Sequence, residues 1–283
     1  MRNLRLSIFV LAFLLSISVF AQDVKIIWQS DSLLRHPESV VYDAKRNCLY
    51  VSNMDKNTSL EQLETDPVSK VSIDGKKVET EWMNGFSSPT GLVLRNDTLY
   101  IVEKNGLAIV DVENKKIIQR IPVSSTGFLN DLTIDTKGRI FVTESEKEGK
   151  IYLIENGKSS LWYSGNEIGG FNGILADGKY LLLGVNSDHT LKKMCLKTQK
   201  VKTVAYLGEG NIDGIQKTLS RDYLVSHFLG NLYEISRKGK VNEIFNSRDK
   251  NLFLADFAYV PELKRIFIPS LRTNHVFSLS YEK

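Results

Sequence analysis

The stretch Asn130-Asp131-Leu132-Thr133-Ile134 begins the pattern that decides the fold of this chain. Two further runs follow it, Ile140-Phe141-Val142 and Lys150-Ile151-Tyr152-Leu153-Ile154, and polar turns separate all three. Short runs rich in β-branched and aromatic residues between polar turns are typical of strands. The pattern therefore predicts consecutive antiparallel strands, the first of which opens with a polar motif.

This pattern occurs six times along the chain, with openings 52, 40, 42, 41 and 42 residues apart. A repeat of about 40 residues with four short strands is typical of a β-propeller. We therefore predict an all-β, six-bladed β-propeller with four-stranded blades, formed as one domain by residues 22–283. The other openings are Glu38-Ser39-Val40-Val41-Tyr42, Thr90-Gly91-Leu92-Val93-Leu94, Asn172-Gly173-Ile174-Leu175, Asp213-Gly214-Ile215 and Ala255-Asp256-Phe257-Ala258-Tyr259.

The two ends of the chain are expected to meet in one blade. The sixth copy contains only three strands before the chain ends at Lys283. The apolar run Val24-Lys25-Ile26-Ile27-Trp28 can supply the fourth strand. Such pairing would close the ring and remove an exposed sheet edge.

The first copy is longer than the others, and the excess lies in residues 54–70, between its second and third strands. Thr58-Ser59-Leu60-Glu61 fits a capping box, which predicts a short helix. Asp66-Pro67 would end that helix. Two interpretations stay open, a surface elaboration and a lid over a site at the same face.

Residues 1–21 have the organisation of a signal peptide. Arg2 and Arg5 precede an uncharged, mostly apolar run over residues 6–20, and Val19-Phe20-Ala21 suits a signal peptidase. Fifteen residues are short for a membrane-spanning helix, which needs about 20. We expect cleavage after Ala21, export to the periplasm or the extracellular space, and no membrane span in the mature protein.

Charge and motifs exclude several partners. The formal charge of +4 falls to +2 when Arg2 and Arg5 are removed, which gives no reason to expect nucleic acid as a partner. Gly208-Glu209-Gly210 lacks the Lys-Ser/Thr ending of a phosphate-binding loop, so nucleotide binding is not expected.

Cys48 and Cys195 fall in blades on opposite sides of the ring, so we expect two free, buried thiols.

The polar openings predict a metal site. The first strand of a propeller blade lines the central channel, so the opening residues of the six blades should ring one channel mouth. Four of them carry the oxygen donors that suit a hard divalent cation. The alternative is that such dipeptides are only turns, as we expect of Asp74-Gly75 and Asp177-Gly178. The predicted metal ligands are Glu38, Asn130, Asn172 and Asp213.

A second ring of polar residues follows the second strands and should face the same mouth. From this ring we select three residues as candidates for contact with a small-molecule substrate, namely Asn53, Glu144 and His227.

The chain resembles the senescence-marker-protein/gluconolactonase family of regucalcin-like propellers, and looks closest to a secreted branch of it. The resemblance rests on Pro37-Glu38, Phe128-Leu129-Asn130-Asp131, Asn172-Gly173 and Ile212-Asp213-Gly214. It implies that Glu38, Asn172 and Asp213 hold a divalent metal, often Ca²⁺, and that Asn130 contacts the metal through water or contacts the substrate. Mg²⁺, Mn²⁺ and Zn²⁺ are alternatives to Ca²⁺.

The resemblance also implies hydrolysis of a sugar lactone or related ester. Phe128 stands where lactonases of that family have a substrate-binding Arg, so the metal site transfers better than the sugar specificity. Our hypothesis is a metal-dependent hydrolase with Asp213, or Asp131 beside the ring of opening residues, as the general base; of the two we favour Asp213. The alternative hypotheses are a non-catalytic propeller that binds a ligand or partner, and a module in which a divalent metal is structural.

Overall fold

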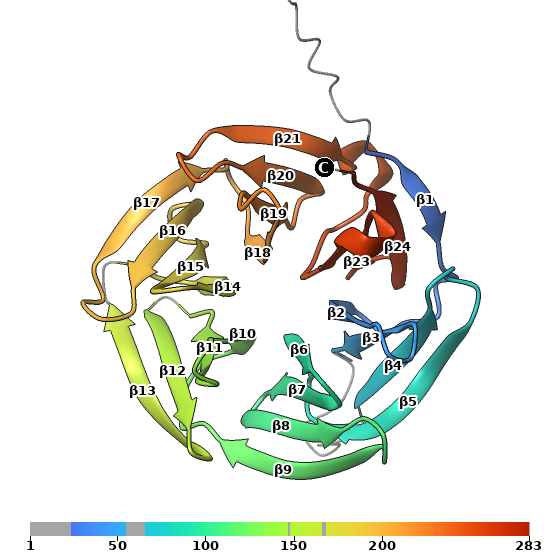
Figure 1. Cartoon of the computed structure of the whole chain (residues 1–283), viewed down its shortest axis with the longest axis horizontal. Helices are drawn as coiled ribbons and strands as arrows, with labels where there is room; N and C mark the ends of the chain where they lie inside the picture. The colour runs from blue at the N-terminus through green and yellow to red at the C-terminus, as the bar shows by residue number, and fades with distance from the viewer. Residues whose placement is uncertain (1–23, 55–65, 147, 166–167, 283) are drawn as a thin grey trace, which may run out of the picture.

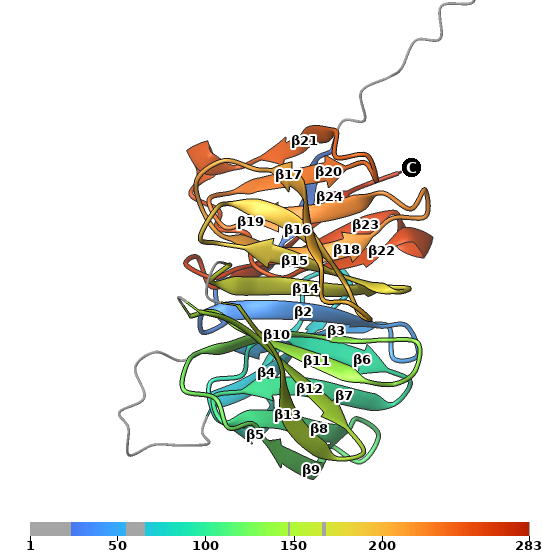
Figure 2. The same cartoon turned by 90° about the vertical axis from the view of Figure 1, so that its left-hand side faces the viewer.

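The computed structural model describes residues 24–54, 66–146, 148–165 and 168–282. Six four-stranded sheets are arranged as blades around a central axis (Figure 1). Within each sheet, neighbouring strands are antiparallel and run between the two faces of the ring (Figure 2). The predicted all-β, six-bladed propeller of four-stranded blades is thus confirmed.

In blades 1 to 3, the strand nearest the axis comes first in the chain and the outermost strand comes last. Blade 1 consists of β2 (Pro37–Asp43), β3 (Cys48–Asn53), β4 (Asp66–Ser72) and β5 (Val78–Phe86). Blade 2 consists of β6 (Leu92–Arg95), β7 (Thr98–Glu103), β8 (Gly106–Asp111) and β9 (Lys116–Pro122). Blade 3 consists of β10 (Leu129–Ile134), β11 (Ile140–Glu144), β12 (Gly149–Glu155) and β13 (Lys158–Gly165).

Blades 4 and 5 repeat this order, and blade 6 takes its outermost strand from the beginning of the chain. Blade 4 consists of β14 (Phe171–Asp177), β15 (Tyr180–Val185), β16 (Thr190–Cys195) and β17 (Val201–Tyr206). Blade 5 consists of β18 (Ile212–Lys217), β19 (Tyr223–His227), β20 (Asn231–Ile235) and β21 (Val241–Asn246), followed by the 3₁₀ turn η1 (Arg248–Lys250). Blade 6 consists of β22 (Ala258–Val260), η2 (Pro261–Leu263), β23 (Arg265–Ser270), β24 (His275–Ser280) and β1 (Ile26–Gln29).

Strand β1 closes the ring as predicted. It pairs antiparallel with β24, with Ile26 opposite Leu279 and Gln29 opposite Phe277. The backbone N–H of Ser30 continues the pairing with a bond of 2.9 Å to the carbonyl oxygen of Val276. The otherwise free edge of β24 is therefore covered by the chain itself.

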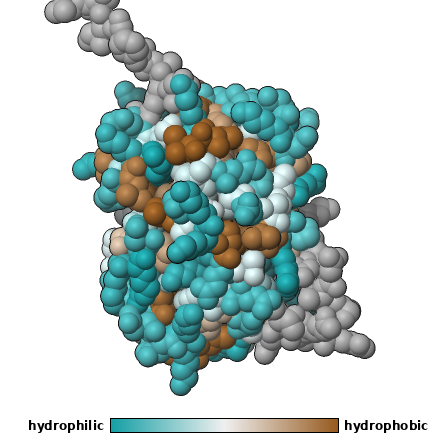
Figure 3. Space-filling model, turned by 90° about the vertical axis from the view of Figure 1, so that its right-hand side faces the viewer, coloured by the Kyte–Doolittle hydropathy of each residue, from teal (hydrophilic) through white to brown (hydrophobic). Residues whose placement is uncertain are grey.

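The apolar core lies between the blades. Second and third strands such as β15 are almost wholly buried, because each lies between two neighbouring blades. Outer strands such as β5 alternate between less and more exposed residues over Val78–Trp82, as strands with one solvated face do. The side of the ring seen in Figure 3 is accordingly mostly hydrophilic, with separate apolar patches. Within the residues described, no helix has the length and apolar character needed to cross a membrane.

The insertion after the second strand of blade 1 ends earlier than expected. Residues 66–70 belong to β4 (Asp66–Ser72), which pairs with β3. The signal peptide and the helix expected at Thr58 lie outside the described residues. So do residues 55–65, which make up most of the insertion interpreted as a surface elaboration or a lid. Both cysteines are free as expected, but Cys195 is partly exposed and only Cys48 is buried.

Asp177 is more than a turn residue. It ends β14 at a hairpin, and its side chain is 8% exposed. Its carboxylate accepts a hydrogen bond of 2.7 Å from the Tyr223 hydroxyl and forms ion pairs with Lys217 and Arg237. All three partners belong to the neighbouring blade 5, so Asp177 joins two blades.

We therefore expect Asp177→Asn to lower the free energy of unfolding by about 1–3 kcal/mol, the range for losing charge-assisted hydrogen bonds. The matched control is Asp74→Asn, at a hairpin turn where the side chain is 55% exposed. Urea unfolding of both variants checks the prediction. Equal stability of the two variants would show that the contacts of Asp177 contribute nothing measurable.

Candidate metal and active site

The inner strands of four blades contain a β-bulge where the sequence predicts a metal ligand. In blade 3 the register of β10 against β11 shifts between Leu129 and Leu132, so Asn130 and Asp131 together face the single residue Thr143. A bulge bends the strand and redirects its side chains, and bulges are common beside active sites. The corresponding pairs in blades 1, 4 and 5 are Glu38-Ser39, Asn172-Gly173 and Asp213-Gly214.

Hydroxyl groups of the second strands hold these bulges and link neighbouring blades. Thr143 Oγ1 accepts a hydrogen bond of 3.1 Å from the N–H of Asp131 and donates one of 2.7 Å to the carbonyl of Asn172 in blade 4. Ser226 does the same for Gly214 and for Ala255 in blade 6, at 2.7 and 2.9 Å. The backbone that carries the predicted ligands is therefore fixed from both sides.

The inner strands approach each other so closely that a side chain would not fit at some bulges. A Cβ atom on Gly173 would lie 1.6 Å from the carbonyl oxygen of Asp213. Gly91 donates its N–H to the carbonyl of Asn130 at 2.8 Å, and Asp256 donates its N–H to the carbonyl of Glu38 at 3.0 Å. The ring of openings is thus a tight constriction of the channel.

The predicted ligands are buried, and three of their oxygens lack partners. Glu38, Asn130, Asn172 and Asp213 are only 3–7% exposed. Among the described residues, Glu38 Oε2, Asn130 Oδ1 and Asn172 Oδ1 have no hydrogen-bond donor. Buried polar atoms are nearly always paired, and an orphan is accounted for by an ion or a water molecule. Oxygens of this kind fit a hard divalent cation such as Ca²⁺.

The carboxylates of the ring act on one another electrostatically. Burial raises the pKa of Glu38 well above its usual value, and the negative charges of Asp213, Asp256 and Asp131 raise it further. Burial raises the pKa of Asp213 to about 8, the charge of Asp256 adds to this rise, and a hydrogen bond with Asn172 opposes it. Four carboxyl groups from four blades therefore share one low-dielectric region. A cation there would favour their ionised forms.

Two of these four carboxylates accept hydrogen bonds from backbone N–H groups. Asp131 accepts hydrogen bonds from the N–H groups of Leu132 at 2.6 Å and Ile174 at 2.9 Å. Asp256 accepts bonds from Phe257 N–H at 2.9 Å and from the hydroxyl of Ser39 at 2.6 Å. Both therefore join neighbouring blades, and Asp213 has more freedom to act on a substrate than Asp131.

Asp256 was not among the predicted site residues. It stands one position after the ring residue Ala255, in the position that Ser39 and Asp131 occupy in their blades. Burial raises its pKa to about 6, with the bonds from Ser39 and Phe257 N–H opposing the rise.

In the described part of the chain, no group of three or more His, Cys, Asp or Glu side chains is placed to hold a metal. The predicted ligand set differs from such a group, since half of it is amides.

The three substrate-contact candidates lie outside the constriction and are buried. Glu144 is 0% exposed and accepts hydrogen bonds from Lys150 and Tyr152, each at 2.9 Å, and from Ser125. These bonds give Glu144 a structural role in the loops of blade 3.

Asn53 is held in the same manner. Its Oδ1 accepts a bond of 2.9 Å from the N–H of Arg35, and its Nδ2 donates to Ser69 at 2.9 Å. His227 differs, because its buried Nε2 has no partner among the described residues. Its ring packs on Gly210, where a Cβ would lie 2.1 Å from Cε1, and burial lowers its pKa. Of the three, His227 keeps an unused polar atom.

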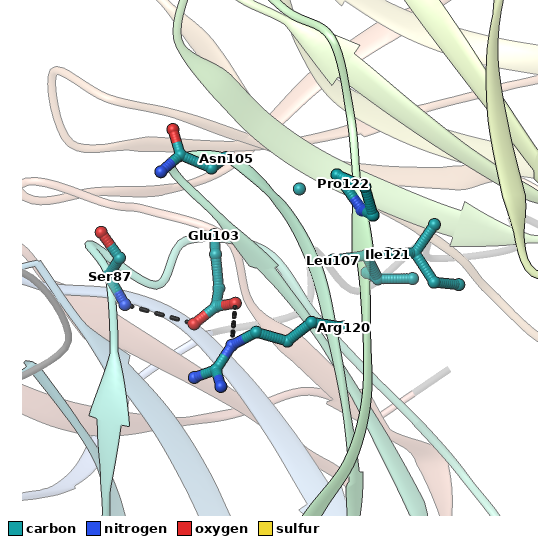
Figure 4. A pocket seen from close by; sticks show the side chains of 8 residues that line it. Ser87, Glu103, Asn105, Leu107, Arg120, Ile121 and Pro122 are labelled. Atoms are coloured by element: carbon teal, nitrogen blue, oxygen red, sulfur yellow. Dashed lines mark hydrogen bonds and ion pairs between the residues drawn. The ribbon is translucent and has the colours of Figure 1, made fainter.

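A cavity of about 170 Å³ lies on the same face, beside blade 2. Figure 4 shows Glu103 between the two groups that bind it, with hydrogen bonds of 3.2 Å from the N–H of Ser87 and 3.1 Å from Arg120 Nε. None of the predicted ligands lines this cavity. It is therefore separate from the ring site.

Comparison with solved structures supports the fold assignment. A gluconolactonase from Xanthomonas campestris superposes with a TM-score of 0.69 at 12% identity, covering 91% of this chain and 89% of that one. A calcium-binding regucalcin from Agrobacterium tumefaciens gives 0.69 at 14% identity over 91% and 94% of the two chains. A luciferin-regenerating enzyme gives 0.67 at 14% identity, also over 91% and 94%.

No protein-family model and no curated protein sequence matches the chain. The likeness therefore concerns the fold, which this chain shares with the gluconolactonase and regucalcin-like propellers. Enzymes with different names share it as well, so the fold does not determine the reaction.

Proposed function

We propose that this propeller, which has the fold of the gluconolactonases, is a metal-dependent hydrolase of a lactone or a related ester. The observation that carries the proposal is the set of three buried, unpartnered oxygens at the inner-strand bulges. Asp213 lies at the corresponding bulge of blade 5. Unlike Asp131 and Asp256, it accepts no hydrogen bond from a backbone N–H among the described residues.

In this proposal Glu38, Asn130, Asn172 and Asp213 hold a divalent cation, with Ca²⁺ the best match to all-oxygen ligands. When bound, such a cation polarises an ester carbonyl and lowers the pKa of water at the site. Glu38 and Asp213 bring two negative charges, which balance the charge of the cation. Asn130 and Asn172 bring neutral oxygens, so the site does not accumulate further repulsion.

Asp213 is the proposed general base. Its carboxylate would accept a proton from the water that attacks the lactone carbonyl carbon. The bond between that carbon and the ring oxygen then breaks, and the ring oxygen takes a proton to become the hydroxyl of a hydroxy acid. Asn172, hydrogen-bonded to Asp213, would keep the carboxylate in place during this step. The oxygens of Asp131 already accept hydrogen bonds from two backbone N–H groups, so Asp131 would hold the inner strands β10 and β14 together instead.

A second candidate function is a non-catalytic propeller that binds a small ligand or a partner, with a structural divalent metal. The observation that favours it is the degree of burial of the ring and its four mutually repelling carboxylates. A cation there would stabilise the fold whether or not any reaction takes place. Under either proposal the mature chain is exported and meets a small molecule at the channel mouth.

A screen of simple lactones and aryl esters tests the hydrolase proposal. We expect turnover that is lost on treatment with EDTA and restored by Ca²⁺, with Mg²⁺, Mn²⁺ and Zn²⁺ compared in parallel. Thermal unfolding is measured on the same samples. Metal-dependent stability without turnover of any probe would favour the structural-metal alternative over the hydrolase.

A further inference from the structure

An arginine lies on two aromatic rings at the face of the propeller that carries the ring site. The Arg272 guanidinium carbon is 4.4 Å from the centroid of the Phe253 ring and 5.6 Å from that of the Phe228 ring. The two rings are themselves 5.3 Å apart. We call these three residues the Arg272 cluster.

The chain topology puts this cluster at the site mouth. Phe253 stands two residues before Ala255, the ring position of blade 6, and Phe228 directly follows the end of β19. The start of β18 pairs with that end of β19, with Ile212 opposite His227. Arg272 lies in the turn between β23 and β24, and a bridge from Leu254 to Ser270 joins this turn to the opening of blade 6.

The turn that carries the arginine is held rigidly. The N–H groups of Thr273 and Asn274 donate to the carbonyl of Ser270 at 3.2 and 3.0 Å. The Oδ1 of Asn274 accepts a bond of 3.0 Å from His36 N–H, and Ser270 Oγ accepts one of 3.1 Å from Phe253 N–H. The backbone that carries Arg272 is thus fixed, and the contacts of its guanidinium with the two rings restrict the side chain, which lowers the entropic cost of binding.

Among the described residues, Arg272 has no counterion. In the part of the chain that the structure describes, its guanidinium contacts the two rings and forms no ion pair. Its side chain is exposed. A planar guanidinium with free N–H groups is suited to a carboxylate, which it can bind through two parallel hydrogen bonds. The guanidinium carbon lies over both rings.

We infer that Arg272 binds a carboxylate of the substrate, so that the enzyme prefers lactones or esters that carry a carboxylate group. This inference rests on the proposed function, since it places the specificity of the same site. Phe228 and Phe253 act as positioning residues, because their rings hold the guanidinium at the mouth. The reacting ester group would lie deeper, toward Asp213.

The test compares ligands that differ only in charge. Pyroglutamate and its carboxamide are lactams that report binding without turnover, and γ-carboxy-γ-butyrolactone and its carboxamide are the corresponding hydrolysable pair. For the wild type with Ca²⁺, we expect the carboxylates to be preferred by roughly 10-fold in Kd and in kcat/KM, as for a charge-assisted hydrogen bond. Arg272→Gln should abolish this preference and leave the values for the carboxamides within about 2-fold, since a neutral ligand makes no ion pair there.

Two further variants separate charge from structure. Arg95→Gln removes an exposed arginine at the opposite face, at the turn between β6 and β7, and should keep the preference. Phe253→Leu should weaken the preference, and Phe253→Tyr should retain it because the ring is kept. Isothermal titration calorimetry gives the binding values and a pH-stat assay the turnover.

The outcomes distinguish the two proposals. A carboxylate preference in binding that depends on Arg272, without lactone turnover, supports a carboxylate-binding site at Arg272 and overturns the hydrolase proposal together with the predicted preference in turnover. Turnover without any charge preference, or with a preference that Arg272→Gln leaves intact, overturns the inference alone. Absence of both binding and turnover of the carboxylate probes also overturns it.

Discussion

Asp213→Asn is expected to lower metal-dependent lactone hydrolysis by about 10²–10⁴-fold, the usual effect of losing a general base. The substitution keeps the shape of the side chain but removes its negative charge and its basic oxygen. Ca²⁺ affinity should fall as well, because Glu38 becomes the one remaining carboxylate of the predicted ligand set. Steady-state kinetics and calcium titration measure the two effects.

The same substitution should make the metal-free protein more stable near neutral pH. Asp213 is a buried carboxylate whose ionisation is opposed by burial and by Asp256, and Asn carries no charge to repel. A purely structural residue would give the opposite result, with activity and stability lost together. Asp74→Asn, at an exposed turn, is the control. If both variants turn over lactones and bind Ca²⁺ like the wild type, Asp213 is neither ligand nor base.

A second large effect is expected when metal is removed and the pH is raised. Asp256 has its pKa raised to about 6 and Asp213 to about 8, whereas both ionise near pH 4 in an unfolded chain. Between roughly pH 4 and pH 8 the folded protein therefore retains protons that the unfolded chain has released, so its free energy of unfolding falls as the pH rises. With EDTA present, we expect Tm to be roughly 5–10 °C lower at pH 8 than at pH 5, as for a loss of a few kcal/mol.

Calcium should remove most of this difference, because a divalent cation favours the ionised carboxylates and binds only the folded ring. The matched variant is Glu38→Gln, which should raise the metal-free Tm at about pH 8 and reduce the stabilisation by Ca²⁺. Differential scanning calorimetry of the wild type and of Glu38→Gln, each with EDTA or with Ca²⁺ at pH 5 and at pH 8, checks both expectations. A metal-free Tm that stays constant or rises over this pH range would contradict the description of four interacting carboxyl groups.

The blade count could be predicted from the sequence because every blade has to repeat the same four strands. The closure could be predicted as well, since the sixth repeat lacked a strand and Val24–Trp28 was the apolar run left over. The end of the insertion after Met54 was misjudged. From the sequence the insertion was expected to extend to Lys70, whereas β4 begins at Asp66 and pairs with β3 and β5.

Residues of the candidate site could be named from the sequence only where they recur periodically. Glu38, Asn130, Asn172 and Asp213 recur in one phase of the repeat, and the structure shows a bulge at each of them. Asp256 was missed because it lies one position later. Asp177 has the local sequence of a turn, but its partners Lys217 and Tyr223 are 40 and 46 residues away. Contacts between blades of this kind leave no local trace in the sequence.

The N-terminal strand of blade 6 also determines the order in which the molecule can be completed. The N–H of Lys25 donates to Ser280 Oγ, 255 residues further along the chain, so β1 cannot find its partner until the last strand has been synthesised. Contacts of such separation form late and slowly. Before β1 pairs with it, the outer edge of β24 is free, and β1 of a second molecule fits this edge as well as the chain's own β1. Incompletely folded molecules could therefore associate by exchanging their N-terminal strands.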